Sequence, residues 1–479
     1  MKYTNATMDS RNIHAIGCDL SDARIQHVLN EITRLKSLAR PVVCLPDLHI
    51  KDRTEAPSSF AAATRDTIVP DLTAPSVGCG MGILTTSLTK KDLDHQAFEQ
   101  FYYFMRRDLG PRYGHLKNIL LWLGLIERPK NTYDLSVKEF EDLIKRGAPM
   151  AVEKYNLPPQ TLNHIENHGS VFTHDELDSL NLSDILPRIS YRSGRHDLGY
   201  GFKGNHFLEI QYIEDILDEE AAQKWNLKKD QVVIMYHGGG GAVSYHIGRY
   251  FANRKKNTLK QKFALFILKA LFHFGAPTKW KYATQRFRYY FFPRPFTEIP
   301  LSSPEGQRLL RATKASLNYS YGFRMAITKR ITDSLRALYP KKDIETALLW
   351  DSSHNTVTRE IIGGEELTVH RHTANRVFEG QPVIISGFNT TNSYLAIGQA
   401  QSENHLFSAD HGAGTVIKRL KTHEHPERLV THIYQTKSPF KQIVTHQTNE
   451  GIDHVTKELT SASIIRPVIR LRPLAVFKG

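Results

Sequence analysis

The stretch IIRPVIRLRPLAVF, residues 464–477, closes the chain and is the longest of its strand-like runs. Ile, Val, Leu and Phe dominate it, a composition that favours a strand. Working back along the chain, similar runs occur at 393–399, 382–388, 231–237, 206–213, 82–88 and 41–50. The sequence therefore predicts a protein with many strands.

Helical spacing accompanies these runs. Ile25, Val28, Leu29 and Ile32 recur at helical intervals within 22–38, and further helices are expected at 303–336 and 341–348. Strands and helices mix without a regular βαβ alternation and no linker interrupts the chain. We therefore expect an α+β fold with mixed sheets in one large domain, residues 1–479.

Charge and composition limit the class of protein. The 479 residues carry a formal net charge of +14, which favours a polyanionic partner such as nucleic acid, although a basic protein without one is the alternative. Three cysteines provide no disulfide framework. The first residues lack a secretory signal, and the apolar run at 263–274 is interrupted by Lys269 and too short to span a bilayer. We expect a soluble, cytoplasmic protein with no membrane partner.

One segment, residues 251–297, stands apart. It contains no acidic residue, and aromatic side chains alternate with eleven lysines and arginines: Arg254, Lys255, Lys256, Lys260, Lys262, Lys269, Lys279, Lys281, Arg286, Arg288 and Arg294. Cations bind phosphates and aromatic rings stack on unpaired bases, so the segment indicates RNA contact. The alternative is an amphipathic helix at 263–274 that docks on the body and leaves a basic face solvated.

Several potential ligands lie beside glycines, turns or strand ends: Asp47 and His49, Cys79, the Asn205–His206 pair with Glu209, His237, and His354 with Asn355. One thiolate with several imidazoles suits Zn²⁺, Mn²⁺ or Fe²⁺. Their spacing matches no local metal motif, so each taken singly is more simply a structural residue, and Cys79 alone could be a small buried side chain.

Two glycine-rich stretches raise further possibilities. In SADHGAG, 408–414, the imidazole of His411 could bind a metal, transfer a proton or act as a nucleophile. The tetraglycine Gly238–Gly241 could present backbone N–H groups to a phosphate, but it lacks the Lys-Ser/Thr of a P-loop.

Taken together, these stretches resemble the RtcB family of RNA ligases, which join a 3′-phosphate or 2′,3′-cyclic phosphate to a 5′-hydroxyl. The matching stretches are DLHIKD, APSVGCGMG, GNHFLEI, HGGGG, PLSSPEGQRLLRATKASLNYSYGFR, His354-Asn355, VHRHTANRVF, SGFNTTNSYLAIG, SADHGAG and RLRPLAVFKG. They follow the family order from about residue 40 to the last residue. The resemblance implies a compact α+β domain with a deep central active-site pocket, to which the basic segment is a peripheral addition.

The resemblance also implies roles for individual residues. His411 would carry GMP as a phosphoramidate, and GMP would pass to the RNA 3′-phosphate before the 5′-hydroxyl displaces it. One or two Mn²⁺ ions would be held by Cys79, His206, His237 and His354. GTP would be contacted by Asn205, Glu209, Ser386, Asn389, Gly412 and Lys478, and Asp47 would be an acid near the metals and a proton acceptor.

Departures from the family pattern accompany this resemblance. Ser76 stands where the family has a metal-binding aspartate, and Gly241 and Thr415 replace two arginines. Phe323 replaces an asparagine, and the family's HRKG becomes HRHT at 370–373. A hydroxyl is a poorer ligand than a carboxylate, which puts a second metal site in doubt.

The resemblance therefore predicts a GTP- and Mn²⁺-dependent RNA ligase or repair enzyme that acts on tRNA or rRNA fragments, with or without an activating partner protein. Two alternatives remain. The protein could guanylylate a 3′-phosphate without efficient joining, or it could be a non-catalytic RNA-binding protein on the same fold.

Overall fold

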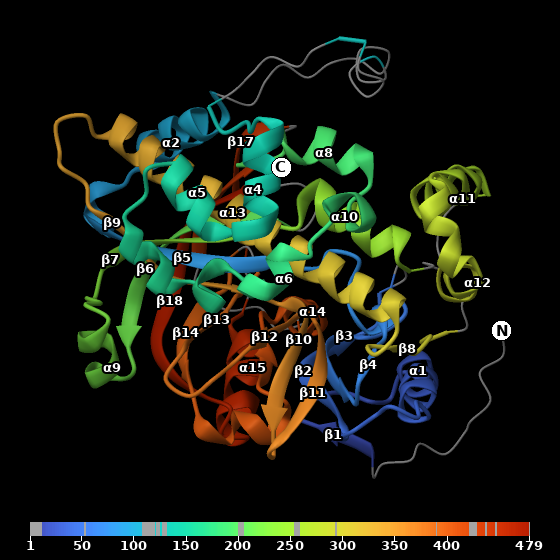
Figure 1. Ribbon diagram of the computed structural model, residues 1–479. Helices are drawn as coiled ribbons and strands as arrows, with labels where there is room; N and C mark the ends of the chain where they lie inside the picture. The colour runs from blue at the N-terminus through green and yellow to red at the C-terminus, as the bar shows by residue number, and fades with distance from the viewer. Residues whose placement is uncertain are drawn as a thin grey trace.

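The computed structural model describes residues 12–51, 54–107, 120, 125–126, 132–199, 206–252, 259–292, 295–388, 390–420, 429–435, 438–445 and 448–478. Strands and helices mix along these residues and pack into one body, as Figure 1 shows. The expectation of a single α+β domain is therefore confirmed.

The closing stretch lies inside the larger sheet. Among the described residues this sheet has the order β13 (Pro382–Ile385), β14 (Ser393–Gly398), β18 (Ile465–Lys478), β6 (Phe207–Ile216), β7 (Gln231–Gly238), β5 (Gly80–Thr89) and β9 (Thr346–Ser353). β6 pairs along one edge of β18, whereas β14 pairs with its first half and β16 (Leu429–Gln435) with its end. β17 (Ser438–Thr445) pairs with β16. The last strand thus joins segments that are more than 200 residues apart.

A smaller sheet lies below it in Figure 1, in the order β1 (Ile13–Ala15), β2 (Val42–His49), β3 (Ser58–Thr64), β11 (Glu365–His372) and β10 (Asn355–Ile362). Two short pairs complete the strands of the described residues: β12 (Ala374–Arg376) with β15 (Ser408–Asp410), and β4 (Thr67–Ile68) with β8 (Ile299–Pro300). β12 and β15 matter most for the site because β15 leads directly into His411.

Helices surround these sheets. They are α1 (Ala23–Thr33), α2 (His95–Arg107), α4 (Val137–Arg146), α5 (Ala148–Lys154), α6 (His174–Asp178), α7 (Leu182–Ile185), α8 (Arg188–Gly194), α9 (Glu219–Lys224), α10 (Gly241–Tyr250), α11 (Leu259–Phe274), α12 (Ala283–Arg286), α13 (Pro304–Leu338), α14 (Gly414–Arg419) and α15 (Glu450–Ser461). No helix within the described ranges is long and apolar enough to cross a membrane.

The long helix α13 is the centre of the helical layer. The hydroxyl of Ser303 accepts from the Gly306 amide and Pro304 occupies the first turn, which is a favourable helix start. Most of the helix is buried, and it packs against α2, α4, α5 and α10. The helix expected at 303–336 is therefore confirmed, and α1 confirms the one expected within 22–38.

The prediction of a helix at 341–348 is wrong. Residues 346–353 form β9, which pairs antiparallel with β5, so that Trp350 lies opposite Ile83 and Leu348 opposite Leu84. The run ALLW is apolar without a clear period, and periodicity alone does not separate a buried strand from a helix. Pairing with β5 decides the conformation.

Candidate active site

A sulfur atom and two imidazoles meet at the ends of β5, β6 and β7. The Sγ of Cys79 lies 3.2 Å from the Nε2 of His206 and 3.3 Å from the Nε2 of His237. The three potential ligand atoms lie within 4.8 Å of one another, and Cys79 and His237 are buried. One ion could contact all three, and thiolate with imidazole is a donor set that divalent transition metals accept.

Two more histidines extend this group. The ring of His354 lies 4.9 Å, between centroids, from that of His237 and 4.2 Å from that of His411. The Nδ1 of His354 is buried and has no hydrogen-bond partner among the described residues. A buried nitrogen without a hydrogen bond lowers the stability of a protein core. This is a reason to regard the His354 Nδ1 as a potential metal ligand. The donor set therefore fits a metal.

Strand pairing brings these residues together. Cys79 immediately precedes β5, His206 precedes β6, His237 is in β7 and His354 follows β9. Gly80 pairs with both Gly238 and Ser353, and Phe207 pairs with His237. The ends of neighbouring strands thus place a cysteine and three histidines side by side, although they span 276 residues of sequence.

A buried arginine holds two of these loops in place. The guanidinium of Arg324 donates to both carboxylate oxygens of Asp351, at 2.8 and 2.9 Å, and to the Gly78 carbonyl at 2.7 Å. It also donates to the Ser353 hydroxyl at 3.1 Å. Gly78 and Ser353 directly precede Cys79 and His354. One side chain on α13 therefore fixes the backbone on both sides of the cluster.

His411 is held in a defined tautomer. Its Nδ1 lies 3.0 Å from the Thr373 carbonyl, which can only accept, so Nδ1 carries the proton and the lone pair is on Nε2. Burial, with the charge of Lys51 adding to it, lowers the pKa of His411 to about 3. The imidazole is thus neutral at pH 7. A neutral ring with a free Nε2 is the form that attacks an electrophile.

Thr373 adopts an unusual conformation in making this bond. Its φ is +54°, a region that disfavours β-branched residues. The Thr373 amide donates to the Asn355 side chain at 2.8 Å, and its hydroxyl accepts from the Ser59 amide at 2.7 Å. These bonds hold the residue in place despite the strain. Thr373 stands where the family pattern has a glycine. The backbone keeps the conformation that suits glycine.

Asp47 lies under the His411 loop rather than among the sulfur and imidazoles. One of its carboxylate oxygens accepts from the amides of Thr415 and Val416, at 2.9 and 2.7 Å, at the start of α14. Its own amide donates to Asp410 at 3.0 Å. Burial raises the pKa of Asp47 to about 7. The contacts are those of a residue that ties β2 to the loop carrying His411.

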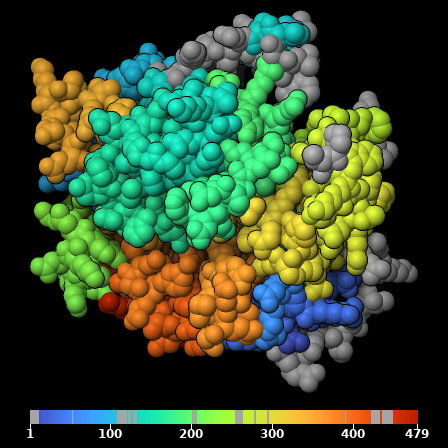
Figure 2. Space-filling view, in the orientation of Figure 1, coloured from blue at the N-terminus to red at the C-terminus, as the bar shows by residue number. Residues whose placement is uncertain are grey.

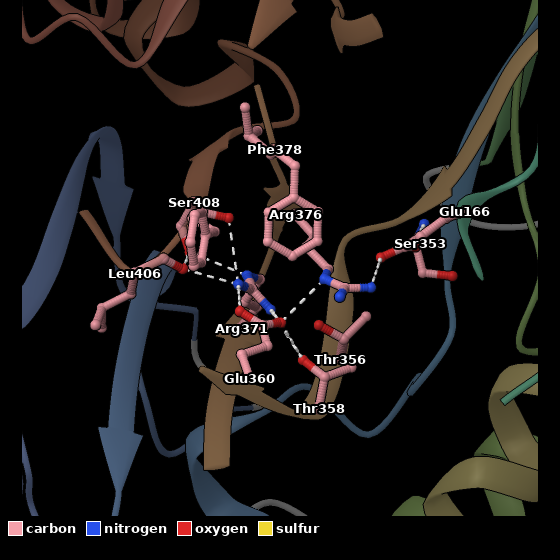
Figure 3. Close-up of polar contacts among 12 residues, drawn as sticks. Glu166, Ser353, Thr356, Thr358, Glu360, Arg371, Arg376, Phe378, Leu406 and Ser408 are labelled. Atoms are coloured by element: carbon pink, nitrogen blue, oxygen red, sulfur yellow. Dashed lines mark hydrogen bonds and ion pairs between the residues drawn. The ribbon is translucent and has the colours of Figure 1, made fainter. Parts of the chain in front are cut away.

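A second buried ion pair positions β15, as Figure 3 shows. Arg371 and Glu360 form two parallel hydrogen bonds of 2.7 Å, and Arg371 also donates to the Ser408 hydroxyl and the Leu406 carbonyl. Arg376 contacts the same Glu360 carboxylate at 3.1 Å. This cluster fixes the strand that ends one residue before His411.

A third group lies where β6, β18 and the 386–388 loop meet. Ser386 bridges to Gly412, and its amide donates to the His411 carbonyl at 2.9 Å. The Nζ of Lys478 lies 4.8 Å from the Phe388 ring. Burial raises the pKa of Glu209 to about 8, and the charge of Lys478 opposes that shift. Glu209 and Lys478 therefore lie close enough to interact, next to a loop that contacts His411. Asn205 and Asn389 lie outside the described residues.

The tetraglycine turn already has partners for some of its amides. The Gly240 amide donates to the Ser320 hydroxyl, and the Ala242 amide donates to the Asp197 carboxylate at 2.9 Å. A Cβ on Gly241 would lie 2.6 Å from that carboxylate. The Asp197 carboxylate therefore lies at the start of α10. This is where Gly241 replaces an arginine of the family.

Ser76 stands in the position of the family's metal-binding aspartate. Its hydroxyl accepts a hydrogen bond from the Asn355 side chain at 3.2 Å.

Residues 253–258 and 293–294 of the basic segment lie outside the described residues. Within the rest, Lys269 and Arg286 are buried rather than available to RNA. Arg286 pairs with Glu305 at 2.7 Å.

Sequence reasoning passed over residues that the structure places beside the site. Arg324, Arg371 and Lys51 were present in the quoted stretches NYSYGFR, VHRHTANRVF and DLHIKD, but no role was assigned to them. The charge of Lys51 acts on Cys79, His237 and His411. The available signal was a lysine or an arginine within each of these matching stretches.

Comparisons with known proteins agree with this geometry. A family model described as tRNA-splicing ligase RtcB matches residues 28–479. The tRNA-splicing ligase RtcB of Methanococcus maripaludis is 27% identical over 432 residues, which cover 84% of this chain and 80% of that protein. That of Thermococcus kodakarensis is 26% identical over 87% of this chain and 83% of its own length. The tRNA-splicing ligase RtcB of Methanocaldococcus jannaschii is 27% identical to this chain. The match covers 84% of this chain and 40% of that protein.

Proposed function

The chain belongs to the RtcB family, and from that premise we propose that it is a GTP-dependent RNA ligase. It joins an RNA 3′-phosphate or 2′,3′-cyclic phosphate to a 5′-hydroxyl, in RNA processing or repair. The observation that carries the proposal is His411, a neutral imidazole whose Nε2 is left free by the Nδ1 bond to Thr373 and whose ring lies 4.2 Å from that of His354.

In this proposal the Nε2 of His411 attacks the α-phosphorus of GTP. The new N–P bond forms as the bond to the pyrophosphate oxygen breaks, so pyrophosphate leaves and the ring holds GMP. Where the RNA ends in a 2′,3′-cyclic phosphate, water first attacks the phosphorus and the bond to the 2′-oxygen breaks, which leaves a 3′-phosphate. The 3′-phosphate then takes GMP from the histidine, and the 5′-hydroxyl attacks the activated phosphate, loses its proton and releases GMP. Dividing one difficult step into easier ones is the usual advantage of covalent catalysis. Thr373 keeps the attacking nitrogen unprotonated.

Cys79, His206, His237 and His354 would hold Mn²⁺, as one ion or two. A bound ion would neutralise phosphate charge and polarise the phosphorus that is attacked. The fit rests on the convergence of the thiol and imidazole nitrogens and on the unsatisfied Nδ1 of His354. Burial raises the pKa of the Cys79 thiol to about 12, while the charge of Arg324 favours the thiolate that a metal would need.

The group around Glu209 would bind guanine. The Glu209 carboxylate would accept from the guanine edge, the charge of Lys478 would favour its ionised form, and Phe388 offers a ring face. Ser386 and Gly412 would line the nucleotide beside His411, and Asn205 and Asn389 are proposed to complete the contacts. Asp47 would support the α14 end of the loop, and its second oxygen, which lies 3.7 Å from His49, would be available as a proton acceptor.

The test is a joining assay with purified protein, GTP and Mn²⁺. The substrate is a pair of RNA fragments, one ending in a 2′,3′-cyclic phosphate and the other beginning with a 5′-hydroxyl. We expect a joined product that requires GTP and Mn²⁺ and does not form when the 5′ end is phosphorylated. Failure to consume either end in the presence of both cofactors would reject the ligase.

A second candidate function has its own support. The Asp197 carboxylate at the start of α10, together with Gly241 and Thr415 in place of arginines, reduces the positive charge available to a second RNA end. The protein could therefore guanylylate a 3′-phosphate without efficient joining. In the same assay this activity would accumulate RNA capped with GMP at its 3′ end and little joined product.

Ser76 provides a test of the second metal. The Ser76→Asp variant should increase Mn²⁺ binding at equilibrium, with at least one further ion bound per chain, because a carboxylate is a far better ligand than a hydroxyl. Metal content after dialysis against Mn²⁺ measures the effect, and Ser76→Asn is the control of similar size without charge. Equal manganese content in wild type and both variants would contradict a role for this position.

A further inference from the structure

The helix α11 exposes an apolar face, unlike an ordinary surface helix, although Leu265, Leu268 and Phe272 of the same helix also pack in or against the core. In its described side chains, residues 263–274, the exposed positions are Phe263, Ala264, Phe266, Ile267 and Leu271. At 3.6 residues per turn these positions fall within an arc of about 160°. Every exposed side chain among these described residues is therefore apolar. The alternative interpretation of the sequence was a helix at 263–274 with a solvated basic face, and the exposed side chains of these residues are instead apolar.

The two polar residues among the described side chains of the helix, Lys269 and His273, face inward. The ammonium group of Lys269 is buried and donates to the carbonyls of Ala252 and Tyr290. The fully buried ring of His273 stacks on Tyr290 with 4.6 Å between centroids, and its Nε2 lies 2.9 Å from the Tyr250 carbonyl. Turning the helix to bury its apolar face would break these bonds. The five exposed apolar residues thus face outward because Lys269 and His273 form their hydrogen bonds inside the protein.

The exposed apolar face continues beyond α11. Among the described residues thirteen large apolar side chains are exposed, and seven of them lie between 263 and 292: Phe263, Phe266, Ile267, Leu271, Trp280, Phe287 and Phe292. Ring contacts connect them, because Phe266 lies 5.2 Å from Phe291, which in turn lies 5.2 Å from Phe287. We call these seven residues the α11 patch. Figures 1 and 2 show α11 and α12 standing at one edge of the molecule.

The segment that carries the α11 patch has charges of one sign. Lys281 and Arg288 are exposed beside it, and residues 251–297 contain no acidic residue. An exposed apolar face with aromatic residues and flanking cations matches the interfacial region of an anionic bilayer, into which such helices insert without spanning it. We propose that the α11 patch docks the protein on an anionic lipid surface. This revises the expectation, drawn from the sequence, that no membrane is a partner.

Other occupants explain less of the α11 patch. Unpaired RNA would use the cations and aromatic rings, but the aliphatic side chains of Ile267 and Leu271 add nothing to base stacking. A second copy of the chain would bring the cations of both copies together with no acid in the segment to pair with them. A lipid surface accounts for the aliphatic, aromatic and cationic residues at once. The proposal does not depend on RNA ligation.

The test is sedimentation of the full chain with vesicles of phosphatidylcholine, with or without phosphatidylserine. We expect binding only to vesicles that contain phosphatidylserine, and weaker binding as salt increases. The double variant Ile267→Ser/Leu271→Ser should lower the partition coefficient about tenfold or more, since two side chains no longer insert. Leu217→Ser, which changes a half-exposed leucine elsewhere, should bind as the wild type does.

Two further measurements separate the alternatives. If neither the wild type nor the Ile267→Ser/Leu271→Ser variant binds vesicles, the proposal is overturned, and weaker oligouridylate binding by a Trp280→Ser/Phe287→Ser variant would then assign the patch to RNA. Dimerisation in sedimentation velocity that the double variant abolishes, again without vesicle binding, would also overturn it. Circular dichroism spectra and melting temperatures of the variants show whether a loss of binding reflects unfolding.

Discussion

Replacing His411 with alanine is expected to abolish labelling of the protein by α-labelled GTP. The proposed N–P bond forms at the Nε2 of this ring, and alanine offers no nucleophile in its place. We expect the Mn²⁺-dependent label of the wild type to fall by at least about a thousandfold, because the chemical step itself is removed. Denaturing gel electrophoresis after brief incubation measures the covalent label directly.

The matched control is His405→Ala. His405 is also largely buried and also hydrogen-bonds a carbonyl, that of Ala462, but it packs against His14 outside the Cys/His cluster. It should label as the wild type does. Acid-labile, alkali-stable label identifies a phosphoramidate rather than an ester. Persistent label in His411→Ala, at the wild-type level, would show that another residue is the nucleophile.

Arg324→Met is expected to be the most destabilising single change at the site. It leaves the Asp351 carboxylate, which is fully buried, with the Tyr236 hydroxyl as its remaining hydrogen-bond partner among the bonds described here. Breaking a buried ion pair from one side costs about 3–5 kcal/mol in the free energy of unfolding. The Gly78 carbonyl and the Ser353 hydroxyl also lose a donor, so Mn²⁺ affinity at Cys79 and His354 should fall. Urea unfolding and metal titration measure the two effects.

Two comparisons interpret that result. Arg359→Met removes a partly exposed pair with Glu366, which should cost less than about 1 kcal/mol. The double variant Arg324→Met/Asp351→Leu replaces both charges with apolar side chains and should recover part of the lost stability. An Arg324→Met protein whose unfolding free energy lies within about 1 kcal/mol of the wild type would mean that Asp351 finds another partner or is neutral.

Much of the local structure could be predicted from the sequence. Runs rich in Ile, Val and Leu became β2, β5, β6, β7, β13, β14 and β18, and the long apolar period became α13. The prediction at 341–348 failed for a defined reason. The apolar run there has no clear period, and pairing with β5 decides that it forms a strand. The strand β10, with its partner β11, was not predicted because both are rich in polar residues.

The candidate site was identified through resemblance, not through spacing. No local rule connects Cys79 to His354 across 275 residues, because their proximity arises from the pairing of β5 with β9. Motifs could therefore name the side chains. They could not show that Arg324 holds both loops, that Thr373 fixes the tautomer of His411, or that Asp197 occupies the start of α10.

The sequence by itself determined the α+β class, the excess of positive charge and the set of thiol and imidazole groups, because these depend on residue type and short-range pattern. Only the tertiary structure decided which groups meet and which faces remain exposed. The helix α11 illustrates the reason. Its hydrophobic residues predict a buried face, but Lys269 and His273 find carbonyl partners only inside the protein, and satisfying those buried polar groups turns the apolar face toward the exterior.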